Sequence, residues 1–370
     1  MRVVQLLGRS TGGIGTHVVE LTRELRALGD DVVVVTDGLT ASTFGLSDAL
    51  VAWPGGHGGL AGALRSLRTL RRTAATADVL HAHGHQAGLV AVLATLGLRT
   101  PVVVSQHNAV LAAGWRRRLL DLAQQVVARR ADLVTGASSD LVEEARRLGA
   151  RDARLAPVPS PRVPALLSAT PPDDAGRRAA ARDLLRDNGI DRPGEPRLVL
   201  TIARIAPQKD LDTLVEATRA LVPHAVWVVV GGGEESLLAR LSQRAGRDGL
   251  PVHFVGPQAD PDRWLQAADV FVLASRWEAR ALVVQEAMAA GVPVVATDTG
   301  GLRDLVEGAG TLVPVGDAAA VAAAVTAYLT DPAAHRVAAD AGRERAASWD
   351  DGERTARRWH EWYRATLRMT

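Results

Sequence analysis

Residues 270–290 read VFVLASRWEARALVVQEAMAA and contain one complete strand–loop–helix unit. The apolar run at 270–274 has the length of a buried strand, and the apolar stretch 282–290 has the length of a helix. A polar loop joins them. Glu278 lies in this loop and Glu286 in the helix, with seven residues between them. A buried strand followed by a helix is the unit from which parallel α/β sheets are built.

The same alternation extends from this unit towards both ends of the chain. Further strands are expected at 198–203, 225–230, 252–255, 292–297 and 311–314 in one half, and at 2–7, 32–36, 79–83, 101–106, 132–137 and 154–158 in the other. Helical stretches separate them, so each half predicts a parallel, doubly wound sheet. We therefore expect an α/β protein with two Rossmann-like domains that face each other across a cleft at the carboxyl ends of their strands.

Prolines interrupt this pattern between residues 157 and 196, where at most one short helix is predicted, at 179–186. We expect an N-terminal domain at 1–165, a linker at 166–196 and a C-terminal domain at 197–348. The tail of the chain, from residue 318 onward, is almost wholly helical in pattern.

The composition is that of a globular protein. Of 370 residues, 47% are apolar, and no apolar run approaches the roughly 18 residues that cross a bilayer. The absence of cysteine excludes disulfides and thiolate sites. The net charge is only +2, which does not predict a nucleic-acid partner. We expect a cytoplasmic location, and peripheral association with the inner face of the cell membrane is compatible with it.

Lys209 is the only lysine of the chain, and the other 42 of the 43 lysine and arginine residues are arginine. It lies in the loop RIAPQKD at 204–210, directly after a predicted strand. Arg204 offers a planar fork and Lys209 a compact charge, and together they could neutralise a leaving diphosphate. Asp210 would then cap the next helix. The alternative is an ordinary polar loop in which one lysine survived by chance.

The start of the helix at 282 is a second candidate site. Free amides near Leu282 and Val283 suit an anion such as pyrophosphate. Glu278 and Glu286, on either side, could accept hydrogen bonds from sugar hydroxyls. The alternative is that Glu278 only complements the helix dipole and Glu286 is a solvated helical residue.

These two stretches resemble the retaining GT-B glycosyltransferases of the family 4 type, and the resemblance covers essentially the whole chain. That family has an arginine and a lysine after the first strand of its C-terminal domain, and then two glutamates with seven residues between them. Gly231-Gly232-Gly233-Glu234, Phe254-Val255-Gly256 and Thr299-Gly300-Gly301 match the surroundings of that pattern. The resemblance implies a GT-B fold in which a final helix, at 349–368, packs back on the first domain.

The resemblance further implies transfer, with retention, of a sugar from a UDP-, GDP-, ADP- or TDP-sugar, with neither metal nor cofactor. The acceptor would be a hydroxyl of a small molecule, a lipid or a polysaccharide. Arg204 and Lys209 would bind the diphosphate, Glu278 the transferred sugar and Glu286 the ribose. Further donor contacts are implied for Gly232 and for Gly256, the latter beside the base.

In the N-terminal half, the resemblance implies a glycine loop and a histidine in the active site. Gly12, Gly13 and Gly15 would form the loop that closes over the phosphates and the sugar. His107, which follows a predicted strand, would lie near the reactive end of the sugar. A satisfied structural histidine is the alternative for His107.

One departure from the family pattern leaves donor preference open. After the first glutamate the family commonly has glycine, an aromatic residue and glycine, whereas this chain has Ala279-Arg280-Ala281. Arg280 replaces an apolar ring and could even bind an acidic group of the donor.

Three histidines, His81, His83 and His85, would share one face of a continuous strand, as a zinc site requires. No cysteine completes such a set, so we expect no metal here and assign His83 and His85 to the acceptor side. A purely structural role is the alternative.

Two arginine clusters could contact an anionic membrane or an acidic acceptor. They comprise Arg65, Arg68, Arg71 and Arg72, and the stretch Trp115-Arg116-Arg117-Arg118. A solvated charged face is the alternative.

Three other functions compete with sugar transfer by retention. Gly13-Ile14-Gly15 followed by Asp37 imitates the fingerprint of an NAD-dependent dehydrogenase, but Val18 occupies the position of its third glycine. A nucleotide-sugar epimerase or an inverting transferase would share the fold. A noncatalytic module would bind a nucleotide sugar or a membrane surface without transfer.

Overall fold

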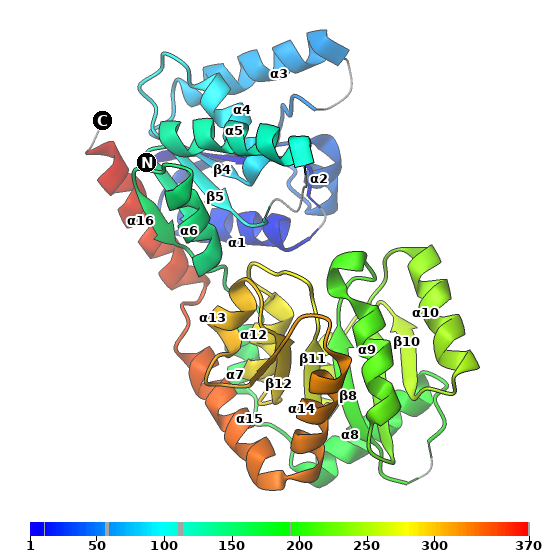
Figure 1. Ribbon diagram of the computed structural model, residues 1–370. Helices are drawn as coiled ribbons and strands as arrows, with labels where there is room; N and C mark the ends of the chain where they lie inside the picture. Colours follow the sequence, from blue (N-terminus) through cyan, green and yellow to red (C-terminus); the bar gives the residue numbers. More distant parts are fainter. Residues whose placement is uncertain (11, 56–58, 110–113, 193, 369–370) are drawn as a thin grey trace. The chain divides into compact units, whose positions relative to one another are not determined.

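The computed structural model describes residues 1–10, 12–55, 59–109, 114–192 and 194–368. The chain forms two compact units, one of residues 1–161 together with 350–370, and one of residues 162–349. Each unit contains one parallel sheet with helices on its faces (Figure 1). The expectation of an α/β protein with two Rossmann-like, doubly wound domains is confirmed.

The sheet of the first unit has seven strands in the order β3-β2-β1-β4-β5-β6-β7. Their bounds are Arg2–Leu7 (β1), Asp31–Thr36 (β2), Leu50–Val51 (β3), Val79–His83 (β4), Val102–Gln106 (β5), Leu133–Gly136 (β6) and Ala153–Leu155 (β7). β3 is too short to leave a periodic signal in the sequence, and it pairs only at the edge, with β2. The strand order reverses between β1 and β4, which is where ligands bind in sheets of this kind.

Helices cover both faces of this sheet. They are α1 (Gly13–Ala27), α2 (Gly38–Thr43), α3 (Gly59–Ala74), α4 (His85–Ala94), α5 (Gly114–Arg130), α6 (Ser139–Arg147) and α16 (Gly352–Leu367). On one face, Val3 and Leu25 form a core with Trp359 and Tyr363 of α16. Successive residues of a strand point to opposite faces, so Val4 belongs to the other core, under α3, α4 and α5.

The sheet of the second unit repeats the same order with six strands, β10-β9-β8-β11-β12-β13. Their bounds are Arg197–Ile202 (β8), Ala225–Val230 (β9), Val252–Gly256 (β10), Val270–Leu273 (β11), Val294–Thr297 (β12) and Thr311–Val313 (β13). Here the order reverses between β8 and β11. The two stretches that carry the predicted chemistry, 204–210 and 275–286, follow these two neighbouring strands.

The helices of the second unit are α7 (Val163–Ser168), α8 (Asp174–Asp187), α9 (Leu211–Ala217), α10 (Glu235–Arg247), α11 (Pro261–Ala267), α12 (Leu282–Ala289), α13 (Gly301–Val306), α14 (Ala318–Thr330) and α15 (Pro332–Ala347). Among the described helices of both units, none is long and apolar enough to cross a membrane.

The stretch 166–196 is not a separate linker. The second half of α7 and the whole of α8 lie in it, and these helices bury Leu166, Leu184 and Leu185 in the core of the second unit with Leu198 of β8. The prolines at 171 and 172 stand between these helices rather than outside a domain. The second unit therefore begins at residue 162, and residues 350–370 return to the first unit.

Candidate active site

The loops that follow β8 and β11 are joined to each other by hydrogen bonds. The amide of Arg276 donates to the carbonyl oxygen of Gln208 at 2.8 Å. The side-chain amide of Gln208 in turn donates to the carbonyl oxygen of Trp277 at 2.7 Å. These two bonds hold the short helix Pro207–Lys209 against the loop that carries Glu278.

As a result, Lys209 and Glu278 form an ion pair. Lys209 Nζ lies 2.5 Å from Glu278 Oε1, and the two side chains are only 15% and 12% exposed. An ammonium has three donors, so this pair leaves Lys209 able to donate to a second oxygen, such as that of a phosphate. Arg204 lies exposed just after β8. The structure therefore brings together two of the four residues predicted to be catalytic.

The loop carrying Glu278 is itself held by a glycine of the next loop. Gly300 has a φ of 48°, and a Cβ atom there would lie 2.3 Å from the carbonyl oxygen of Glu278. The amide of Gly301 donates to that same oxygen at 2.8 Å. A side chain at position 300 would thus displace the backbone of Glu278.

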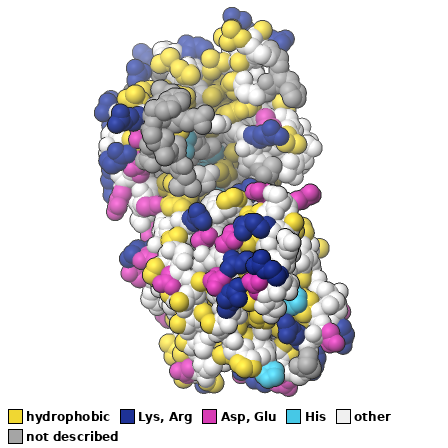
Figure 2. Space-filling view, turned by 45° about the vertical axis from the view of Figure 1, so that its right-hand side comes forward, with side chains coloured by type: hydrophobic (Ala, Val, Ile, Leu, Met, Phe, Trp, Pro, Cys, Tyr) yellow, Lys and Arg dark blue, Asp and Glu magenta, His cyan; other side chains and the backbone are white. Residues whose placement is uncertain are grey.

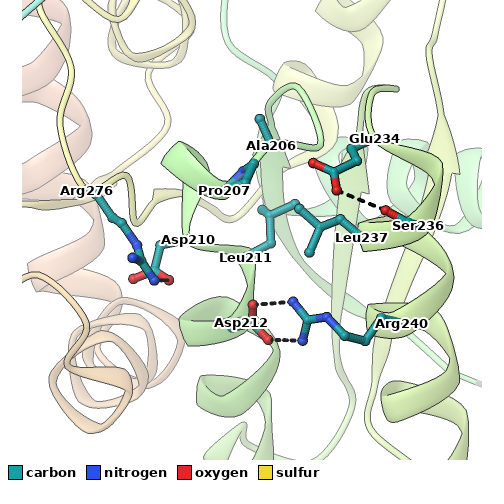
Figure 3. Close-up of a pocket in the computed structure, with 10 residues that line it drawn as sticks. All are labelled: Ala206, Pro207, Asp210, Leu211, Asp212, Glu234, Ser236, Leu237, Arg240 and Arg276. Atoms are coloured by element: carbon teal, nitrogen blue, oxygen red, sulfur yellow. Dashed lines mark hydrogen bonds and ion pairs between the residues drawn. The ribbon is translucent and has the colours of Figure 1, made fainter. Parts of the chain in front are cut away.

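Asp210 does not cap α9 with its side chain as expected. Its backbone is left-handed, with a φ of 46°, and its carboxylate instead accepts from the Thr213 hydroxyl at 3.0 Å and from Arg276 at 3.2 Å. Figure 3 shows Asp210 and Arg276 beside a pocket of about 470 Å³. On its other side, Arg240 makes a two-pronged ion pair with Asp212. The residues that line this pocket include none of the predicted donor contacts.

Glu286 is buried in α12, with 5% of the residue exposed, so the alternative that it is a solvated helical residue is wrong. Arg162 Nη1 donates to Glu286 Oε2 at 3.1 Å, and the same guanidinium pairs with Asp262 of α11. Arg162 thus orients the second predicted carboxylate. The sequence pattern does not single out Arg162, because it stands among prolines and 124 residues away from its partner.

The predicted anion site lies at the amino end of α12. Ala281 occupies the N-cap position, and among the described residues no side chain caps the helix there. Leu282 and Val283 open the helix half-buried, with no acidic residue in the first turn. Gly232 follows β9, and Gly256 ends β10, at the far edge of the sheet from β11.

Arg280 points towards Trp349, with its guanidinium carbon 5.1 Å from the centre of the indole ring. Burial lowers its pKa to about 10, so it remains a cation at neutral pH. Within the described part of the chain, its buried Nε has no hydrogen-bond partner. The side chain thus packs against the last residue of the second unit.

In the first unit, the predicted glycine turn begins α1. Gly12 is the N-cap residue, Gly13 is the first residue of the helix, and the amide of Gly15 donates to the carbonyl oxygen of Gly12 at 2.9 Å. A Cβ atom at Gly15 would lie 2.2 Å from the ring of Phe44. Close packing against Phe44 is therefore one reason for a glycine at this position.

The histidines do not form a continuous strand face. β4 ends at His83, Gly84 turns the chain with a φ of 94°, and His85 opens α4. Nε2 of His85 lies 2.6 Å from the carbonyl oxygen of Asn108. Among the residues that the structure describes, no group of three potential ligands is placed to hold a metal ion.

His83 and His107 instead meet in a buried cluster with His17. His83 Nδ1 lies 3.3 Å from His107 Nε2, and the two rings are nearly parallel, at 15°. Burial lowers the pKa of His107 to about 3 and that of His17 to about 4, and it lowers the pKa of His83 well below its usual value. All three imidazoles are therefore neutral at physiological pH.

The chain matches two family models. One, described as "Glycosyl transferase 4-like domain", covers residues 12–161, and the other, "Glycosyl transferases group 1", covers residues 196–331. A D-inositol 3-phosphate glycosyltransferase of Jonesia denitrificans is 31% identical over 82% of this chain and 79% of its own length. The enzyme of the same name from Thermomonospora curvata is 35% identical over 74% of this chain and 68% of its own length.

A similar fold is found in the crystal structure of Anabaena Alr3699/HepE in complex with UDP. That structure superposes with a TM-score of 0.83 at 21% identity, and covers 99% of this chain and 100% of the Anabaena chain. The same protein in complex with UDP-glucose superposes with a TM-score of 0.79 at 22% identity, over 98% of this chain and 99% of its own.

Proposed function

The chain belongs to the group 1 glycosyl transferases and is thus a glycosyltransferase, and we propose that it is a retaining and metal-independent one. It would transfer a sugar from a nucleoside-diphosphate sugar to an acceptor hydroxyl. The observation that carries this proposal is the ion pair between Lys209 and Glu278 at the point where the strand order of the second sheet reverses.

In this proposal, catalysis is mostly electrostatic. The bond between the sugar and the diphosphate breaks, and negative charge develops on the leaving phosphate oxygen. Arg204, Lys209 and the first amides of α12 stabilise this charge. The acceptor hydroxyl attacks from the side that the phosphate leaves, and the phosphate oxygen takes its proton.

Each predicted carboxylate has its own part in donor binding. Glu278 accepts from a hydroxyl of the transferred sugar while it keeps Lys209 in place. Glu286, held by Arg162, accepts from the ribose hydroxyls. Gly12, Gly13 and Gly15, with His107, belong to the first unit and would act on the phosphates and the sugar, and Gly232 and Gly256 would contact the nucleotide. His85 stays assigned to the acceptor side, whereas His83, whose two ring nitrogens lie within hydrogen-bond distance of Gln5 and His107, would act there only through His107.

We further propose a UDP-sugar as donor and an inositol phosphate as the acceptor to be tried first. UDP and UDP-glucose are the ligands of the Anabaena structures, and the two bacterial relatives are named for D-inositol 3-phosphate. A thermal-shift screen with UDP, GDP, ADP and TDP decides the base, since a ligand that binds only the folded protein raises its melting temperature.

The reaction is tested with the donor that this screen selects. Proton NMR of the product should show the anomeric configuration of the donor, and turnover should persist in EDTA. An inverted product would identify an inverting transferase, and loss of turnover in EDTA, restored by a divalent ion, would contradict metal independence.

A dehydrogenase is not favoured. Val18 stands where a third glycine would be required, and it is buried between Leu7 and Val34. Its side chain fills the contact between α1 and the sheet. An epimerase is not favoured either, because the relatives are transferases.

The first unit also supports peripheral contact with an anionic membrane. Residues 49–120 contain eight arginines and a single acidic residue, Asp78. On α3, Leu60 and Leu64 are exposed beside the exposed Arg65, Arg68 and Arg72. Figure 2 shows arginine among hydrophobic side chains at the top of the molecule, where α3 lies in Figure 1. Exposed leucine next to arginine suits a surface of anionic headgroups.

Not every arginine of the two clusters is available for this contact. Arg71 donates from Nη1 to the carbonyl oxygens of Ala94 and Leu96, at 3.0 and 2.6 Å, and so holds the end of α4. The side chains of Trp115, Arg116 and Arg117 lie outside the part of the chain that the structure describes. Arg118 is exposed on α5.

A further inference from the structure

A chain of buried hydrogen bonds runs through the first unit from β6 to the histidine at the end of β5. Ser105 Oγ lies 2.8 Å from Thr135 Oγ1 and 2.7 Å from His81 Nε2. His81 Nδ1 lies 2.6 Å from the phenol oxygen of Tyr363, which comes from α16 at the end of the chain. All four side chains are at most 2% exposed.

The second half of this chain connects Tyr363 to His107. Gln5 of β1 donates from Nε2 to Tyr363 Oη at 3.2 Å. Its other atom, Oε1, lies 2.5 Å from His83 Nε2, and His83 Nδ1 lies 3.3 Å from His107 Nε2. Gln5 is fully buried and His83 is 3% exposed, so water does not compete for these groups.

Each of these bonds restricts the position of one proton. Tyr363 receives a proton from Gln5, so its own O–H is free to donate to His81 Nδ1. Because Gln5 Oε1 can only accept, His83 must carry its proton on Nε2. Burial keeps His83 neutral, so its Nδ1 has a lone pair and accepts from His107 Nε2. The single proton of the His107 ring is then on Nε2.

We propose that Tyr363, Gln5 and His83 are positioning residues that set the tautomer of His107, with the proton on Nε2 and the lone pair on Nδ1. His107 then acts as a hydrogen-bond acceptor at Nδ1, where it can orient a substrate hydroxyl. The final helix of the chain thereby contributes to the site as well as to the core. The catalytic consequence rests on the proposed function, in which His107 contacts the sugar, whereas the tautomer itself does not.

The direct test is nitrogen-15 NMR of the whole chain labelled at histidine. Long-range correlations between ring protons and ring nitrogens distinguish a nitrogen that carries a proton from one that has a lone pair. His107→Asn identifies the signals of residue 107. We expect Nε2 of His107 to be protonated at neutral pH in the unsubstituted protein. A proton on Nδ1 of His107 instead would overturn the proposal. The measurement is made on the unsubstituted protein, so the only variant that has to fold is His107→Asn, which is used for assignment.

Tyr363→Phe tests the positioning role. It removes the phenol oxygen, so neither orientation of the Gln5 amide is favoured and His107 should become a mixture of both tautomers. With the donor identified above, kcat should fall about 10- to 100-fold, the range known for metal-bound imidazoles that lose an outer hydrogen-bond partner, while the donor KM stays within about twofold. Gln5→Met, which has a similar shape and no polar atom, should have the same effect by a different substitution.

Trp359→Phe is the matched control. Trp359 packs against the same His81 ring, at 4.4 Å between ring centres, and lies on the same helix as Tyr363. It takes no part in the hydrogen-bond chain, so the tautomer of His107 and kcat should be unchanged. If Trp359→Phe and Tyr363→Phe shift the tautomer equally, general loosening of α16 explains the effect and the positioning role is rejected.

The two proposals fail separately. If the protein transfers no sugar but His107 keeps its proton on Nε2, the proposed function fails and the tautomer assignment stands. If the protein transfers sugar and His107 carries the proton on Nδ1, the tautomer assignment fails and the proposed function stands.

Discussion

Lys209 Nζ lies 2.5 Å from Glu278 Oε1, so the only lysine of the chain is held by a glutamate 69 residues further along. Both side chains are largely buried, and neither is fixed by its own loop alone. In the proposed function, a donor diphosphate that enters this site would therefore meet a cation already in position, and Glu278 would remain beside it to contact the sugar.

Lys209→Ala should lower kcat by roughly 10²–10³, because one preorganised charge at the leaving oxygen is lost. Arg240→Ala is the matched control, since it removes a cation from the Asp212 ion pair in the same unit. Steady-state turnover with the selected donor measures both, and thermal melting verifies folding. Turnover near that of the unsubstituted enzyme in Lys209→Ala would remove this residue from the site.

Arg162→Met should raise the donor KM by about tenfold, equivalent to roughly 1.4 kcal/mol, because Glu286 loses the guanidinium that orients it. The buried carboxylate of Glu286 loses its guanidinium partner, which should also destabilise the second unit by roughly 1–3 kcal/mol. Urea unfolding and donor titration measure the two effects.

The double variant Arg162→Met/Glu286→Gln separates them. Stability should largely return, since the buried side chain at 286 is no longer charged when its guanidinium partner is gone, whereas donor affinity should stay low. Recovery of donor affinity in this variant would show that Glu286 does not contact the donor.

Acid should destabilise the first unit through its buried histidines. Burial lowers the pKa of His107 to about 3 and of His17 to about 4, whereas both titrate near 6.5 when unfolded. Below pH 6.5 the unfolded state therefore binds more protons than the folded state, and stability falls as pH decreases towards 4. The slope should be about 1.4 kcal/mol per pH unit for each histidine involved.

His17→Gln checks the origin of that slope. Chemical denaturation between pH 7.5 and 5 measures how the free energy of unfolding falls with pH. In this variant the slope should be smaller by the contribution of one proton, about 1.4 kcal/mol per pH unit. An unchanged slope would mean that His17 does not contribute.

Arg68→Gln/Arg72→Gln should weaken binding to vesicles that contain anionic lipid, by about 1 kcal/mol for each arginine. Arg354→Gln/Arg364→Gln removes the same charge from exposed positions on α16 and should leave binding unchanged. Co-sedimentation at several salt concentrations measures both variants. Equal loss in the two pairs would indicate nonspecific attraction by net charge, and the absence of binding by the unsubstituted protein would refute a membrane surface.

The order of strands and helices could be read from the sequence because periodicity and length are local properties of the chain. The loops that carry Lys209 and Glu278 could be recognised for the same reason. β3 escaped prediction because two residues have no period. The prolines obscured the helix at 163–168 and the start of the helix at 174–187, of which only 179–186 was predicted.

The sequence by itself thus determined a two-sheet α/β protein and the residue types of the proposed nucleotide-sugar site. Only the tertiary structure decided which of those residues meet. The contacts of Lys209 with Glu278, of Arg162 with Glu286 and of Tyr363 with His81 join positions 69, 124 and 282 residues apart. Such contacts depend on which strands become neighbours in a sheet and on where the chain returns, and no local pattern of side chains encodes either.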